Sequence, residues 1–214
     1  MRESFISQLE TLHAELILMG ALCEDAIASA IKGLIEEDED LQKKVVRLER
    51  EINHKEREIE DFCLRLLIRE QPVAKDLRQI SAAQKLISNM ERIGDQALDI
   101  SEISAFMTGS NIKSDVHISE MARATVTMLQ KSVDSFVTGD IDGAKEVIAY
   151  DDVVDNLFVK IKTELVGEIS KDLTSGGACL DLLMIAKYLE RIGDHAVNIA
   201  EQVIYTVTGE RGTT

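Results

Sequence analysis

The chain contains the same pentapeptide twice, because residues 91–95 and residues 190–194 both read ERIGD. The likeness extends outward: residues 85–100 read KLISNMERIGDQALDI, and residues 184–199 read MIAKYLERIGDHAVNI. A five-residue identity can arise by chance, but a shared register along most of a chain indicates duplication of one unit. We therefore expect two copies of a single structural unit.

Each copy is expected to consist of three helices. Aromatic residues make up only 4% of the chain and Pro72 is the only proline, which favours long helices over strands. Apolar residues gather on one side of a helical wheel, and in the first helix they recur at steps of three and four, as on the buried face of an amphipathic helix. In the first helix they are Phe5, Leu9, Leu12, Leu16, Met19 and Leu22, and in the third they are Leu77, Ile80, Ile87, Ala97 and Leu98.

Turn signals set the expected helix limits. An acidic turn at 36–40, Pro72, a Gly-containing link at 108–111, a turn at 139–140 and a Ser-Gly-Gly break at 175–177 interrupt the apolar pattern. After a first helix that ends near the acidic turn, helices are expected at about 41–68, 74–107, 114–137, 142–170 and 178–207. An extended coiled coil is the alternative, but the regular breaks argue against it.

The predicted fold is all-α, with two tandem antiparallel three-helix bundles related by internal duplication. The first bundle is expected to span residues 1–108 and the second residues 112–209, followed by a flexible tail at 210–214.

Charge and cysteine content limit the partners and the compartment. The net charge is −15, so nucleic acid and free phosphate would be repelled, whereas cations and basic protein surfaces would be attracted. No secretory signal opens the chain, and the apolar stretch at 16–22 is too short to span a bilayer. Cys23, Cys63 and Cys179 are scattered, as expected for buried reduced thiols in a cytoplasmic protein.

Acidic residues form a strip on the third helix of each copy. At about 100° per residue they fall within an arc of roughly 80° and extend over about three turns. The strip runs along the edge of the apolar stripe, so the carboxylates should lie where the bundle meets solvent or in a groove. The strip consists of Glu91, Asp95, Asp99 and Glu102, and its second-copy counterpart of Glu190, Asp194, Asn198 and Glu201.

The spacing within this strip argues against an ordinary solvated face, which is the general expectation for acids on helices. Glu91 and Asp95, and again Asp95 and Asp99, place like charges four residues apart, which costs on the order of a few tenths of a kcal/mol per pair. Arg92 lies one residue off the strip and is not expected to serve both neighbouring acids. Bound cations would remove the repulsion, and carboxylates suit Mg, Mn, Fe or Ca.

The second helix of each copy offers further ligands at the rim of such a site. Asp151 and Asp155 lie four residues apart, and their repeat partners are Glu49 and Asn53. Because Asn53 is neutral and the helix carries many other charges, this signal is weaker than the strip on the third helix.

The glycines inside predicted helices and the four histidines are expected to have packing or surface roles, not catalytic or ligand roles. Gly94 and Gly193 lie inside predicted helices, where glycine costs about 1 kcal/mol relative to alanine. We therefore expect another helix to approach closely at these positions. The four histidines have no ligand-like spacing, so packing or surface roles are expected.

Three function classes remain open from the residues alone. The chain has no P-loop, dinucleotide fingerprint, nucleophile elbow or zincin motif, and nothing suggests a substrate pocket, so a non-enzymatic binding protein is expected. A metal-dependent hydrolase that uses the clustered carboxylates is the alternative. A purely structural helical protein, whose acids bind nothing, is the third.

The repeated ERIGD, with acids one turn before and beyond it, resembles the E/D-x-x-x-D motif of the PhoU family. Residues 71–78, which read QPVAKDLR, are similar to that family's link into its third helix. The resemblance covers essentially the whole chain, and two ERIGD copies at this separation are highly specific.

The resemblance implies a cytoplasmic protein with two three-helix bundles, frequent homodimerisation and multinuclear metal clusters. The metals would be iron or zinc, as in some members, or magnesium or manganese. The implied ligands of one site are Glu91, Asp95, Asp99 and Glu102, those of the other are Glu190, Asp194 and Glu201, and Asp151, Asp155 and Glu49 are candidates from neighbouring helices. Asn198 and Asn53 each replace an acid of the other copy, so the two sites need not bind equally well.

The resemblance also implies a role in phosphate regulation. A PhoU-like protein would be a negative regulator of phosphate uptake and of the phosphate-starvation response. It would act as an adaptor between the ATPase of the phosphate ABC transporter and a phosphate-sensing histidine kinase, and would be peripheral to the membrane at most.

Overall fold

The computed structural model describes residues 2–107 and 117–210, and these residues form long α-helices without any strand. The all-α prediction is therefore confirmed. The elements are α1 (Arg2–Glu36), α2 (Glu39–Glu70), α3 (Ala74–Ala105), α4 (Ile118–Thr138), α5 (Ile141–Lys171), the short 3₁₀ helix η2 (Leu173–Ser175) and α6 (Gly176–Thr208).

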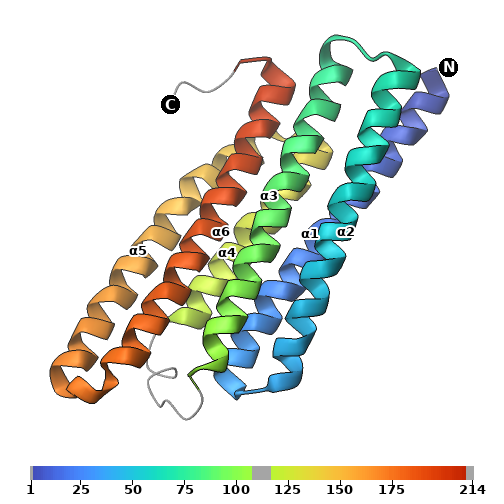
Figure 1. Cartoon of the computed structure of the whole chain (residues 1–214). Helices are drawn as coiled ribbons and strands as arrows, with labels where there is room; N and C mark the ends of the chain where they lie inside the picture. Colours follow the sequence, from blue (N-terminus) through green and yellow to red (C-terminus); the bar gives the residue numbers. More distant parts are fainter. Residues whose placement is uncertain (1, 108–116, 211–214) are drawn as a thin grey trace.

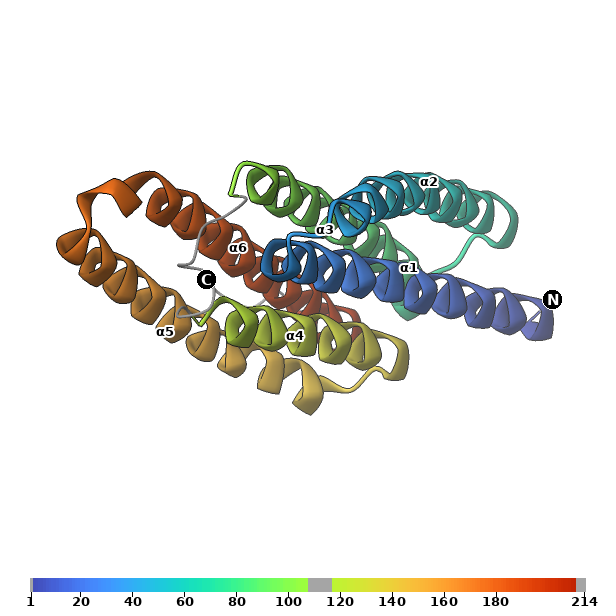
Figure 2. The same cartoon turned by 90° about the horizontal axis from the view of Figure 1, so that it is seen from below.

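The helices form two three-helix bundles that lie side by side, with α1–α3 in one and α4–α6 in the other (Figure 1). Within each bundle every helix packs against the other two. The bundles meet where α3 packs against α6 and α1 against α4, while α2 and α5 lie at opposite outer edges (Figure 2). The prediction of two tandem three-helix bundles is confirmed. The packing of the two bundles against each other is a further feature that the structure shows.

Equivalent aspartates begin the second helix of each bundle. The Asp38 carboxylate accepts hydrogen bonds from the backbone N–H groups of Asp40 and Leu41, and Asp140 accepts one from Asp142. These side chains satisfy N–H groups that have no partner within the helix. The duplication therefore includes the helix caps as well as the ERIGD segment.

Several predicted boundaries shift by a few residues. The expected break at 175–177 was wrong in part, because Gly176 and Gly177 form the first turn of α6 and the chain breaks instead at η2, where Asp172 caps the turn through Thr174 N–H. The fourth helix begins at Ile118 rather than at residue 114. The predicted link at 108–111 and residues 211–214 of the predicted tail lie outside the described residues.

The core follows the predicted apolar faces closely. Leu12, Leu16 and Met19 of α1 are fully buried, and Phe5, Leu9 and Leu22 pack against them. The stripe on α3 was wrong at Leu77, which is 45% exposed because it lies in the first turn of the helix, at one end of the bundle. The three cysteines are buried and free, as expected.

The buried positions of α2 and α5 match one another in the register of the repeat. The matching buried pairs are Val45 with Val147, Ile52 with Val154, Ile59 with Ile161 and Cys63 with Leu165. Each position on the outer face of α2 therefore has a defined counterpart on α5.

No helix within residues 2–107 and 117–210 is both long enough and apolar enough to cross a lipid bilayer.

Gly94 marks a close approach of α2 to α3, as its place inside a helix predicted. A Cβ atom at this position would lie 3.0 Å from Cδ1 and 3.2 Å from Cγ2 of Ile52, which is fully buried. Ile52 is stiff and enclosed, so it has little room to move away from an added methyl group.

We expect Gly94→Ala to destabilise the protein by about 1–2 kcal/mol, since overpacking outweighs the better helix propensity of alanine. Gly167→Ala in α5 is the matched control, because nothing lies within 4 Å of its added Cβ. The control should gain up to about 1 kcal/mol. Urea unfolding measures both values, and a Gly94 variant as stable as the Gly167 variant would contradict the close approach.

Candidate functional site

The glycines of the ERIGD segments bring acids of neighbouring helices next to the strip. A Cβ atom at Gly193 would lie 3.3 Å from Oδ1 of Asp151 and 3.5 Å from Cγ1 of Val154. The backbone of α6 therefore admits α5 so closely that Asp151 lies beside the acids of α6. At Gly94 the backbone of α3 likewise allows α2 to pack closely against it.

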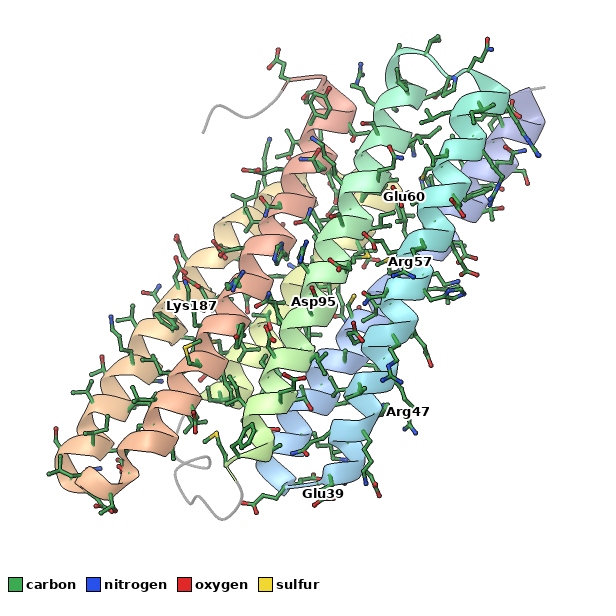
Figure 3. The ribbon with its side chains drawn as sticks, in the orientation of Figure 1. Glu39, Arg47, Arg57, Glu60, Asp95 and Lys187 are labelled. Carbon is green, nitrogen blue, oxygen red and sulfur yellow. The ribbon has the colours of Figure 1, made fainter. Side chains whose placement is uncertain are left out.

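Four carboxylates gather between α5 and α6, and we call them the second-copy acid cluster. Burial, together with the charges of Asp155 and Asp194, raises the pKa of Asp151 to about 6. Burial and Glu190 also raise the pKa of Asp194, against the attraction of Lys187. Lys187 forms an ion pair with Glu190 and is labelled in Figure 3. The members are Asp151, Asp155, Glu190 and Asp194.

A matching first-copy acid cluster lies between α2 and α3 and consists of Glu49, Glu56, Glu91 and Asp95. Burial and the charge of Asp95 raise the pKa of Glu91, with smaller effects from Glu56 and Glu49. The glutamates that open the two ERIGD segments are similarly enclosed, with side chains 20% exposed at Glu91 and 18% at Glu190. The predicted repulsion between neighbouring acids is thus present in both copies.

Arg92 corrects one expectation from the sequence. Its Nε lies 3.4 Å from Oε2 of Glu91, and its Nη1 lies 3.4 Å from Oδ2 of Asp95. The long side chain folds along the helix and reaches both acids, although its Cα lies off the strip. Arg92 is nevertheless 59% exposed, so water screens these contacts and they offset the repulsion only in part.

Asn53 gives the first-copy cluster a different ligand chemistry. Its Nδ2 donates a hydrogen bond of 2.5 Å to Oε1 of Glu49, while its Oδ1 is buried without a hydrogen-bond partner in the described structure. A buried amide oxygen without a partner costs free energy, and amide oxygens are ligands for hard cations. The equivalent position in the second copy is the carboxylate of Asp155.

Asp99 interacts with side chains of the neighbouring bundle. Burial, Glu102 and Asp95 raise its pKa, whereas Arg191 and a hydrogen bond from Tyr188, both on α6, lower it. Asp99 therefore joins α3 to α6, although it lies close enough to Asp95 for the two charges to interact.

Glu102 and Glu201 lie apart from both clusters. Glu102 is exposed and lines a hollow of about 350 Å³ between the start of α2 and the end of α3. Glu201 is exposed and lies about two turns beyond Asp194 on α6. Their roles as ligands stay predictions, as do those of the residues that the structure brings together.

Glu56 is a cluster member that the sequence analysis missed. Burial and the neighbouring charge of Glu60 raise its pKa, while Arg57 and Arg92 lower it. It lies two turns beyond Glu49 on the same side of α2, a spacing that was available as a signal. Its repeat counterpart is Phe158, so a search for acids shared by both copies does not detect it.

The side chains as placed do not form a ready-made metal site. In the part of the chain that the structure describes, no group of three or more His, Cys, Asp or Glu residues is positioned to hold one ion. The donor chemistry still suits a cation, because several carboxylates repel one another at half-buried positions. Rotamer changes would have to bring the oxygens together around an ion.

Polar contacts between α3 and α6 also join the two bundles. His195 Nδ1 lies 2.9 Å from Oδ1 of Asn89, and Arg78 Nε donates a hydrogen bond of 3.3 Å to the carbonyl oxygen of Thr206. His195 thus has a packing role, as expected.

We expect Asp151→Asn to stabilise the metal-free protein at pH 8 but not at pH 4. The folded-state pKa of about 6 exceeds the ordinary value of 3.8, so the folded state binds the proton more tightly than the unfolded state. The resulting stability is full below about pH 4 and is lost as the pH rises through about 6. Asparagine, which stays neutral, avoids this loss.

Thermal unfolding in EDTA tests this expectation. Allowing for solvent screening, the gain at pH 8 should be about 1 kcal/mol, or about 2–4 °C in Tm. Asp61→Asn on the exposed side of α2 is the control and should shift Tm little. An equal gain at both pH values would show that ionisation of Asp151 is not the cause.

Comparisons with known proteins agree with this architecture. The family model described as "PhoU domain" matches residues 16–104 and again residues 118–203. A Clostridium acetobutylicum protein named "Phosphate-specific transport system accessory protein PhoU homolog" is 35% identical over 212 residues, covering 98% of this chain and 97% of that protein. A Deinococcus radiodurans protein of the same name is 34% identical and covers 99% of this chain and 100% of its own length.

Solved structures give the same result. The crystal structure of PhoU from Pseudomonas aeruginosa superposes with a TM-score of 0.88 at 34% identity, covering 96% of this chain and 100% of that one. The phosphate transport system regulatory protein PhoU from Streptococcus pneumoniae reaches a TM-score of 0.90 over 98% of this chain, at 24% identity, and shows the shared fold. With both bundles matched by the domain model and relatives aligned along their full length, the chain belongs to the PhoU family.

Proposed function

We propose that this chain is an accessory regulatory protein of phosphate-specific transport. The observation that carries the proposal is the match to proteins of that name over nearly the whole of both chains. Both bundles and the segment between them fall within the aligned length, so the comparison covers the entire unit and not one shared domain.

The proposed action is that of an adaptor and not of an enzyme. The chain contacts the ATPase of the phosphate ABC transporter and a phosphate-sensing histidine kinase, and it restrains uptake and the starvation response when phosphate is plentiful. This part rests on the family resemblance. The two bundles support it by presenting separate outer surfaces at α2 and α5 (Figure 1). A homodimer, a cytoplasmic location and a non-enzymatic role belong to the same proposal.

The two acid clusters are proposed to bind metal ions. The donor set is carboxylate-rich, which suits Mg, Mn, Fe or Zn, and the buried Oδ1 of Asn53 adds a neutral oxygen to the first cluster. A bound cation would supply positive charge between helices whose carboxylates repel one another. Because Asn53 stands where the second copy has Asp155, the two clusters need not bind the same number of ions.

Metal binding predicts a stabilisation that depends on the clusters. Protein purified without chelator should contain metal by elemental analysis, and an ion at about 100 times its Kd should stabilise it by about 2.7 kcal/mol. Asp95→Asn with Asp194→Asn should abolish most of this gain in Tm. Asp61→Asn with Asp134→Asn, two exposed positions on α2 and α4, is the matched control and should retain it. A metal content near zero after reconstitution would refute metal binding.

The regulatory role predicts a phenotype in cells. Deletion of the gene should raise the expression of phosphate-starvation genes in phosphate-rich medium, because the restraint is lost. A promoter fusion and the rate of phosphate uptake measure this effect, and the control is complementation with the wild-type chain. Unchanged expression and uptake after deletion would contradict the role in regulation.

A further inference from the structure

The outer side of α2 carries a basic surface that none of the proposed metal ligands uses. Steps of three and four residues place seven side chains on this side, opposite the buried positions of α2. We call these seven the α2 ridge, and they are Arg47, Arg50, His54, Arg57, Asp61, Leu64 and Ile68. All seven are exposed, and Figure 3 shows Arg47 projecting from the outer edge of the molecule, away from α3.

Among the residues that the structure describes, the arginines of the α2 ridge form no ion pair. The ion pairs that α2 makes within the described chain use its lysines and His54, and Arg47, Arg50 and Arg57 take part in none of them. Arg57 lowers the pKa of nearby Glu56 without forming an ion pair with it. Arg47 and Arg50 lie three residues apart and repel one another, and only Arg57 has an opposite charge on the ridge, at Asp61 four residues further on.

The second copy shows whether the fold itself requires the arginines of the α2 ridge. Because the buried residues of α2 and α5 share one register, each ridge position has a known counterpart in the second copy. The counterparts are Ala149, Asp152, Asn156, Val159, Thr163, Val166 and Ser170, and none of them is basic. A three-helix bundle of this type forms without the arginines, so the bundle fold does not require them.

We propose that the α2 ridge docks an acidic, amphipathic α-helix of a partner protein. Arginine forks match carboxylates with two parallel hydrogen bonds, which favours Asp or Glu opposite Arg47, Arg50 and Arg57. Toward the end of α2 the ridge becomes apolar, with Leu64 45% and Ile68 75% exposed. The partner helix therefore carries acids along one part of its face and apolar residues along the next.

The narrow distribution of the basic side chains favours a helix as the partner over a flat or bulky anion. The basic line is about one residue wide, with Glu51 and Glu58 about 70–90° to one side of it and Glu60 about 90° to the other. A lipid surface or a nucleic acid duplex would press against these acids as well. A single helix contacts only the ridge, as in side-by-side helix packing. This surface excludes every member of the acid clusters, so the inference goes beyond metal binding and does not depend on it.

The test uses the full-length protein and two synthetic peptides of about 25 residues, capped and designed to be helical. One peptide carries Glu opposite the ridge arginines and Leu opposite Leu64 and Ile68, and the other has Gln in place of each Glu. Fluorescence anisotropy at low salt measures binding to the wild type and to two charge-reversal variants. The ridge variant is R47E/R50E/R57E, and the control variant, with the same change in net charge at exposed positions of α4 and α5, is R123E/K145E/K162E.

We expect the Glu peptide to bind the wild type, and the ridge variant to weaken this binding by about tenfold or more, with added salt weakening it further. The control variant should change binding by less than about threefold, and the Gln peptide should bind weakly to every protein. Circular dichroism verifies that both variants keep their helix content.

Two results would overturn the proposal. The first is a Glu peptide that fails to bind, or that binds the ridge and control variants equally. The second is vesicles containing phosphatidylglycerol that bind the wild type but not the ridge variant while the peptide does not bind, which would assign the ridge to a lipid surface. An unchanged deletion phenotype would refute the regulatory role but leave the peptide result intact, so the two failures are distinguishable.

Discussion

The close approach of neighbouring helices at Gly94 and Gly193 is the contact on which the rest of the structure depends. At Gly94 it packs the buried Ile52 against the backbone of α3, and at Gly193 it places Asp151 against the backbone of α6. The packing of the core and the electrostatics of the site therefore both follow from the same kind of contact, made once in each bundle. A larger residue at either glycine would separate the helices, and the carboxylates of α2 and α5 would then move away from the strip and into water, where their repulsion is screened.

The duplication preserved this contact while the charges around it diverged. Arg92 is the cation that reaches the strip in the first copy, whereas Lys187 pairs with Glu190 in the second. The residue before the first strip that corresponds to Lys187 is Ser88, so the two copies use bases at different positions. A shared backbone thus holds two electrostatically different sites. Each cluster has four carboxylates, but the second has Asp155 where the first has Asn53, and the first has Glu56 where the second has Phe158.

The sequence predicted what depends on periodicity and on the repeat, but not which side chains meet across helices or how far a flexible side chain reaches. Helix limits, buried faces and the packing role of the glycines follow from local spacing, and all are found with small shifts. A helical wheel gives the direction of Asp99 but not the neighbour that it meets, so the contact with Tyr188 on α6 was missed. Glu56 escaped because its counterpart, Phe158, carries no charge, and the reach of Arg92 escaped because the wheel places Cα atoms and not flexible side chains.

The two proposed surfaces of α2 are linked by electrostatics. The first-copy acid cluster and the α2 ridge lie on adjacent sides of one helix, and Glu56 of the cluster directly precedes Arg57 of the ridge. Charges this close interact well within a Debye length, so the acids of the cluster weaken the attraction of the ridge for an acidic helix. A cation bound in the cluster would cancel part of this opposing charge and strengthen docking. The same cation, by linkage, would bind more tightly when the partner helix is in place.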